Sequence, residues 1–124
     1  MRPLLFAVSA ILLLIIGCAH SYLGERHLFP RLFALPNLPL FRSDRTYTQR
    51  VLRWAWHLTS LAWWGLALLL FLFAFPPTSP RLLEQVCGGI AFLSGLVILA
   101  TAGTRHPAWL LFLLAGALTW IAAA

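Results

Sequence analysis

The residues able to do chemistry in this sequence concentrate in two short polar segments, each beside a long apolar run. The segments read HSYLGER at residues 20–26 and RWAWHLTS at residues 53–60. They contribute His20 and His57, with Glu25 and Arg53 as charged neighbours. Neutral imidazole is the commonest metal ligand in proteins, and arginine binds carboxylates and phosphates through paired hydrogen bonds. The two segments therefore predict a ligand site.

The residue types leave the identity of the ligand open. Two facing histidines can hold a haem iron, and the same pair joined by Glu25 would make a metal site of His20, His57 and Glu25. A cofactor site of His20, His57 and Arg53 would instead hold an anionic group, such as a haem propionate or a lipid head group. Proton handling is a third use of imidazole. The alternative without a ligand is that both histidines hydrogen-bond neighbouring helices, while Arg53 extends to the lipid phosphates.

Composition places the chain in a membrane. Hydrophobic residues make up 61% of the 124 residues and charged residues only 10%, and the mean hydropathy is +0.88. A soluble domain of this size has too much surface for so little polar cover. The nine basic residues are all arginines that flank apolar runs, whereas a nucleic-acid binder needs an exposed basic face. We therefore expect an all-α integral membrane four-helix bundle. Its expected partner is the lipid bilayer, and we expect it to bind no nucleic acid.

Four apolar runs approach the roughly 20 residues that cross a bilayer core. They cover about residues 4–23, 52–75, 82–102 and 108–124 and form a single domain. Thr46-x-x-Gln49 predicts a capping box ahead of the second run. The turn FPPTSPR at 75–81 predicts Ser79 as the cap of the third helix with Pro80 in its first turn, and Pro107 predicts the start of the fourth.

Residues 24–46 form the long connection of the chain. Pro30, Pro36 and Pro39 predict that no continuous helix crosses it. Its many leucines and phenylalanines are unlike a free loop, so we expect it to lie in the membrane interface with its arginines toward anionic head groups. A lid over His20 and His57 is the alternative.

The arginines predict an orientation. If the chain alternates across the membrane, Arg26, Arg31, Arg42, Arg45, Arg50, Arg53 and Arg105 lie on one side, and Arg2 and Arg81 lie on the other. The positive-inside rule then predicts a multi-pass inner-membrane protein with both termini on the non-cytoplasmic side. The segment IIGC at 15–18 fits a lipoprotein cleavage site, but cleavage there would send six of these arginines across the membrane.

Small residues predict how the last two helices pack. Gly88, Ala91, Gly95 and Ala102 share one face, and Ala115, Thr119 and Ala122 share another, which permits close helix contact within one copy or between copies of a homo-oligomer.

Three classes of function remain open. The first is a small membrane protein with a metal, haem or head-group site at its cytoplasmic face. The second is a structural or accessory subunit of a larger membrane complex. The third is a membrane enzyme acting on a lipid or quinone, for which His57 or Glu25 would be the base.

Overall fold

The computed structural model describes residues 1–75 and 78–124, and every regular element in these residues is helical. The four long helices are α1 (Arg2–Leu23), α3 (Arg45–Ala74), α4 (Pro80–Ala102) and α5 (Ala108–Ala122). Shorter elements join them: η1 (Gly24–Leu28), α2 (Phe29–Ala34), η2 (Phe41–Ser43) and η3 (Gly103–Arg105). Three helical stretches, 2–34, 45–74 and 80–105, are long and apolar enough to cross a membrane, whereas α5 is shorter.

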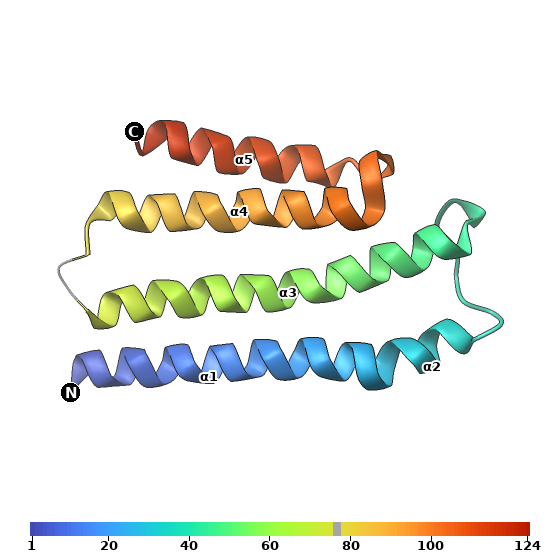
Figure 1. The fold of residues 1–124 in the computed structure, drawn as a ribbon, viewed down its shortest axis with the longest axis horizontal. Helices are drawn as coiled ribbons and strands as arrows, with labels where there is room; N and C mark the ends of the chain where they lie inside the picture. Colours follow the sequence, from blue (N-terminus) through green and yellow to red (C-terminus); the bar gives the residue numbers. More distant parts are fainter. Residues whose placement is uncertain (76–77) are drawn as a thin grey trace.

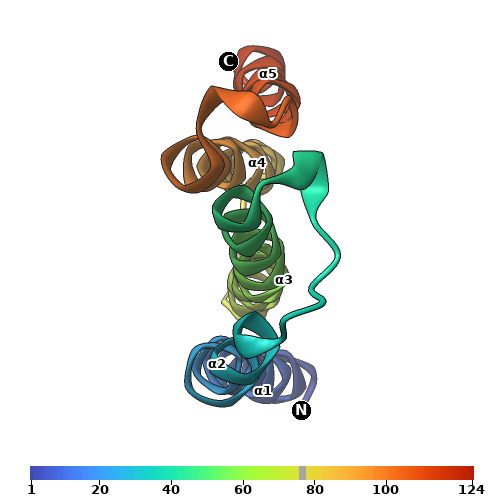
Figure 2. The same ribbon diagram turned by 90° about the vertical axis from the view of Figure 1, so that its right-hand side faces the viewer.

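The long helices run up and down in a single row (Figure 1). Viewed nearly along the helices, α1, α3, α4 and α5 follow one another in that order rather than closing around a common core (Figure 2). The extensive helix contacts join α1 to α3, α3 to α4, and α4 to α5. Both termini lie at one end of the row, and the connections 24–44 and 103–107 lie at the other (Figure 1). The expected four helices are present, but they form an open row instead of a closed bundle.

The first helix continues well past the expected end at residue 23. Gly24–Leu28 form a wider, π-helical turn, in which the Phe29 N–H bonds the Gly24 carbonyl, and α2 then extends the helix to Ala34. Pro30 is accommodated because it falls in the first turn of α2, directly after the wide turn, where a missing N–H costs least. The break comes at Leu35, whose backbone is extended. Arg45 holds this end by donating from Nη2 to the carbonyls of Phe33 and Leu35, at 2.6 and 2.7 Å.

The start of α3 corrects the capping prediction. Asp44, not Thr46, is the capping residue, and its carboxylate accepts the Tyr47 N–H at 2.9 Å. Aspartate is among the best helix caps because its carboxylate accepts backbone donors that the first turn leaves unpaired. The prediction for α4 is confirmed, since Ser79 accepts the Leu82 N–H at 3.1 Å. Pro107 precedes α5 as expected, and residues 76 and 77 of the predicted turn lie outside the described residues.

Glycines allow the last two helices to touch. A Cβ atom on Gly88 would lie 3.1 Å from the Gly116 carbonyl oxygen, and one on Gly116 would lie 2.7 Å from the Gly88 carbonyl oxygen. The small face of α4 is therefore confirmed at Gly88 and Gly95. Within this chain the α4–α5 contact does not use the predicted face of α5, because Ala115 and Ala122 are exposed and Gly116 makes the contact.

Candidate functional site

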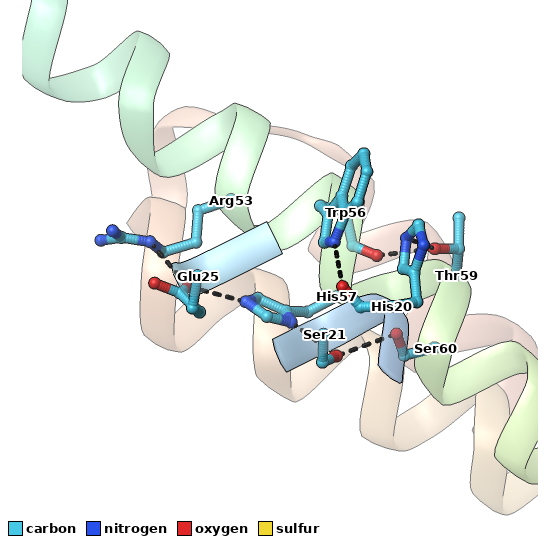
Figure 3. Close-up of polar contacts among 8 residues, drawn as sticks. All are labelled: His20, Ser21, Glu25, Arg53, Trp56, His57, Thr59 and Ser60. Atoms are coloured by element: carbon cyan, nitrogen blue, oxygen red, sulfur yellow. Dashed lines mark hydrogen bonds and ion pairs between the residues drawn. The ribbon is translucent and has the colours of Figure 1, made fainter. Parts of the chain in front are cut away.

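Glu25, Arg53 and His57 form an ion-pair cluster between η1 and α3 (Figure 3). The same carboxylate oxygen, Glu25 Oε1, lies 2.9 Å from Arg53 Nε and 2.8 Å from His57 Nε2. The guanidinium of Arg53 also lies 5.5 Å above the ring of Phe29, which is almost completely buried. The wide turn at 24–28 places Glu25 toward α3, one helical turn after Ser21. Three of the four predicted site residues are thus neighbours.

His57 uses both of its ring nitrogens. Nδ1 lies 2.9 Å from Ser21 Oγ, and Ser21 Oγ lies 2.9 Å from the fully buried Ser60 Oγ. A carboxylate only accepts hydrogen bonds, so Nε2 carries the hydrogen that Glu25 receives. The result is a continuous chain of hydrogen bonds from the half-exposed Glu25 to the interior between α1 and α3.

His20 lies in a separate environment, against aromatic rings. Its imidazole stacks on Trp56 with ring centres 3.9 Å apart and planes 7° from parallel, and it meets Trp63 in a T-shaped arrangement with ring centres 5.0 Å apart. Its Nε2 lies 2.9 Å from Thr59 Oγ1. The Thr59 hydroxyl donates its hydrogen to the Trp56 carbonyl at 2.6 Å. Since the Thr59 hydroxyl already donates its hydrogen to the Trp56 carbonyl, Nε2–H of His20 is the donor to Thr59.

This bond fixes the tautomer of neutral His20. A neutral imidazole has one N–H, and when Nε2 carries it, Nδ1 keeps a free lone pair. Within residues 1–75 and 78–124, Nδ1 of His20 has no hydrogen-bond partner. His20 therefore offers one open acceptor from a ring that stacking holds in place.

The structure does not bring the predicted metal ligands together. His57 and Glu25 bond each other, whereas His20 bonds Thr59 beside Trp56 (Figure 3). In the part of the chain that the structure describes, no three histidine, cysteine, aspartate or glutamate side chains converge on a position able to hold a metal ion. The haem and metal arrangements considered from the sequence both need His20 and His57 on one ligand, and they stay predictions, since the two histidines have different partners in this structure.

A groove of about 610 Å³ opens beside His20. Its walls are mainly leucine and tryptophan, and its polar groups are two imidazoles and one guanidinium. The lining residues are His20, Leu23, His27, Leu28, Arg31, Leu32, Leu35 and Trp56. The extension of α1 through η1 into α2 forms most of it, so the groove exists because the helix does not stop at residue 23.

Sequence reasoning missed Thr59 and Arg31 as site residues. Two signals in the sequence point to the α1–α3 contact. Gly17 and Gly24 are seven residues apart and therefore share a helix face, and each receives an indole, from Trp64 and Trp56 respectively. Nothing local marks Arg31, because its position depends on the helix continuing past Pro30.

No protein family matches this chain, and no similarity to a curated protein or to a solved structure was found. By its fold, the chain is an all-helical protein with three helices that are long and apolar enough to cross a membrane.

Proposed function

We propose that this chain is a multi-pass membrane protein that binds an anionic phospholipid in the groove between α1–α2 and α3. The observation that carries the proposal is the composition of the groove. It is a mostly apolar groove of about 610 Å³ whose polar groups are His20, His27 and Arg31. Ligand pockets are typically roughly 300–1,000 Å³, mostly apolar, with a few polar groups that orient the ligand. An acyl chain fits the leucine walls, and a phosphate fits Arg31.

Charge supports an anionic head group over a neutral one. Arg31 lines the groove and is exposed, and neither acidic residue of this end of the molecule, Glu25 or Asp44, lines it. Glu25 is paired with Arg53 and His57, and Asp44 with Arg105 at 2.8 Å. Basic pockets between transmembrane helices are typical sites for lipid head groups, and each basic residue near the surface contributes about 1 kcal/mol of attraction to anionic lipid.

We further propose that the groove lies at the cytoplasmic interface of an inner membrane and that both termini lie on the opposite side. Seven arginines belong to the end of the row that holds the groove, and Arg2 and Arg81 belong to the other end. An arginine bias of this size orients membrane proteins with the richer end inside. In this orientation α5, with 15 residues, crosses the membrane as a short fourth span.

The test is lipid retention by the purified protein. Wild type and Arg31→Gln are reconstituted in nanodiscs that contain phosphatidylcholine with a minor share of phosphatidylglycerol, and bound lipid is counted by native mass spectrometry. Loss of about 1 kcal/mol predicts roughly 5-fold weaker retention of phosphatidylglycerol by Arg31→Gln. Arg81→Gln, at the far end of the row, is the matched control and should retain lipid as wild type does.

Two results would contradict the proposal. Equal retention of phosphatidylcholine and phosphatidylglycerol by the wild type would show that the groove does not recognise charge. Displacement of the lipid by inorganic phosphate or glycerol 3-phosphate would show that the site takes a soluble anion and that the apolar walls contribute nothing.

A further inference from the structure

We propose that the groove selects phospholipids whose head group carries a free hydroxyl, and that Nδ1 of His20 accepts the hydrogen of this hydroxyl. This inference rests on the proposed function and narrows it from any anionic phospholipid to the phosphatidylglycerol class. His20 is then the residue that determines specificity, and Arg31 is the residue that supplies affinity for charge.

The first step of the argument is the tautomer. Thr59 accepts the Nε2 hydrogen of His20 because the Thr59 hydroxyl is itself donated to the Trp56 carbonyl at 2.6 Å. Nδ1 of the neutral ring is therefore an acceptor. The ring cannot reverse this assignment by flipping without losing the bond to Thr59, and its centre lies 3.9 Å from that of Trp56 and 5.0 Å from that of Trp63.

The second step is the inventory of the groove. Arg31 has donors only, and the four leucines have neither donors nor acceptors. His27, the second imidazole, is exposed, and no hydrogen bond among the described residues fixes its ring, whereas His20 supplies a fixed acceptor. A phosphodiester with a simple alkyl head group has acceptors only, so it pairs with Arg31 and leaves Nδ1 of His20 without a partner. A glycerol head group has the same charge and adds two hydroxyl donors.

The third step is magnitude. A neutral hydrogen bond contributes about 1 kcal/mol, and leaving a polar group buried without its partner costs about 1–3 kcal/mol. Because His20 is only partly buried, the lower end of this range applies, at about 1–1.4 kcal/mol. A lipid that satisfies His20 should therefore bind roughly 5- to 10-fold more tightly than one that covers His20 without bonding it.

The experiment compares two lipids of equal charge, one whose head group carries two hydroxyls and one whose shorter alkyl head group carries none. Phosphatidylglycerol and phosphatidylethanol with identical acyl chains are both singly charged phosphodiesters, and they compete in phosphatidylcholine nanodiscs with native mass spectrometry as the readout. For the wild type we expect roughly 5- to 10-fold more phosphatidylglycerol bound than phosphatidylethanol. Phosphatidylethanol should in turn exceed phosphatidylcholine, because charge recognition does not need the hydroxyl.

Variants assign the preference to His20. His20→Phe keeps a ring that stacks on Trp56 and removes the acceptor, so the two anionic lipids should bind equally while phosphatidylethanol retention stays unchanged. His106→Phe is the matched control, because His106 lies in the α4–α5 turn against Trp54, away from the groove. It should keep the preference of the wild type.

The outcomes separate the two proposals. Equal binding of both anionic lipids to the wild type overturns the selection by His20 and leaves the anionic site standing. Absence of any preference over phosphatidylcholine overturns both. A preference that survives in His20→Phe assigns the hydroxyl to another residue and overturns this inference. The wild-type ratio is decisive by itself if His20→Phe does not fold.

Discussion

At the residue scale, His20 and His57 differ in how many of their ring nitrogens are hydrogen-bonded. His57 is saturated, with Nε2 on Glu25 at 2.8 Å and Nδ1 on Ser21 at 2.9 Å. His20 is bonded at Nε2 alone among the described residues. A histidine whose hydrogen-bonding groups are all satisfied holds helices together, and one with an open lone pair in a groove can recognise a ligand. The residue types alone made the two indistinguishable.

The tautomer of His20 is a direct prediction. In ¹⁵N spectra of histidine-labelled protein near neutral pH, without anionic lipid, His20 should show a protonated Nε2 and a bare Nδ1. Thr59→Val removes the acceptor that selects this form, so the two tautomers of His20 should then coexist. The resonances of His57 serve as the internal control and should not change. A wild-type His20 with its proton on Nδ1 would contradict the assignment.

The Glu25–Arg53 pair should contribute little to stability. Their side chains are 44% and 49% exposed, so solvent screens the pair. Exposed ion pairs typically contribute about 0.2–1 kcal/mol. A double-mutant cycle of Glu25→Gln and Arg53→Gln, followed by the unfolding free energy in detergent, should give a coupling energy in this range. A coupling near 3 kcal/mol would show that membrane lipid or the protein excludes water from the pair.

At the element scale, periodicity predicted the working face of α3 but not the extent of α1. A stripe of polar and aromatic residues recurs at helical spacing: Arg50, Arg53, His57, Ser60 and Trp64. All of these except the exposed Arg50 contact α1 or η1. A helical period identifies a face whatever packs on it. The end of α1 depended on whether a wide turn would accommodate Pro30. The rule that proline breaks a regular α-helix does not predict whether such a turn forms. The groove could therefore not be predicted from the sequence.

Gly24 controls the packing of this element. A methyl group there would meet the indole of Trp56, whose Nε1 donates to the His20 carbonyl at 2.9 Å. We expect Gly24→Ala to destabilise the protein by about 1–3 kcal/mol, the usual cost of overpacking. Thermal unfolding in detergent measures this change. Gly89→Ala is the matched control, because its Cβ would meet only Trp120, at an ordinary 3.8 Å. Equal stability of the two variants would contradict the close α1–α3 approach.

Asp44 ties the start of α3 to the α4–α5 turn and should make this end sensitive to acid. The hydrogen bond from the Tyr47 N–H, followed by that from Arg105, lowers the pKa of Asp44 below its ordinary 3.8. A carboxyl with a lowered folded pKa stabilises the fold above the unfolded pKa, and this contribution disappears as the pH falls through the folded pKa.

The corresponding variant is Asp44→Asn, which keeps a capping oxygen and removes the charge. It should unfold at the same temperature as wild type at pH 2 and at a lower temperature at pH 6. Glu84→Gln, a carboxylate near the far end of the row, is the comparison for a general effect of charge. A wild-type advantage of equal size at both pH values would show that the ionised carboxylate contributes nothing.

At the scale of the whole molecule, the order of the helices was predictable and their arrangement was not. Short connections make sequential helices neighbours, and α1–α3, α3–α4 and α4–α5 are indeed the packed pairs. Whether α5 packs against α1 to close the bundle depends on its apolar faces. These faces can contact lipid or another helix equally well, since lipid tails are as apolar as leucine. Leu111 and Ile121 of α5 are 68% and 72% exposed and fit a lipid-facing surface. The apolar pattern therefore does not distinguish a closed bundle from a row.

Orientation decides which leaflet supplies the ligand, and thiol labelling tests it. In a Cys18→Ala, Cys87→Ala background, Asn37→Cys marks the connection near the groove and Ala124→Cys marks the C-terminus, both at exposed positions. Seven arginines against two predict that a membrane-impermeant maleimide labels Ala124→Cys on intact cells and labels Asn37→Cys only after permeabilisation. The reverse pattern would put Arg31 and His20 in the outer leaflet. The attraction of the cytoplasmic leaflet for basic residues would then no longer act on the groove, and recognition would rest on Arg31 and His20 within the groove itself.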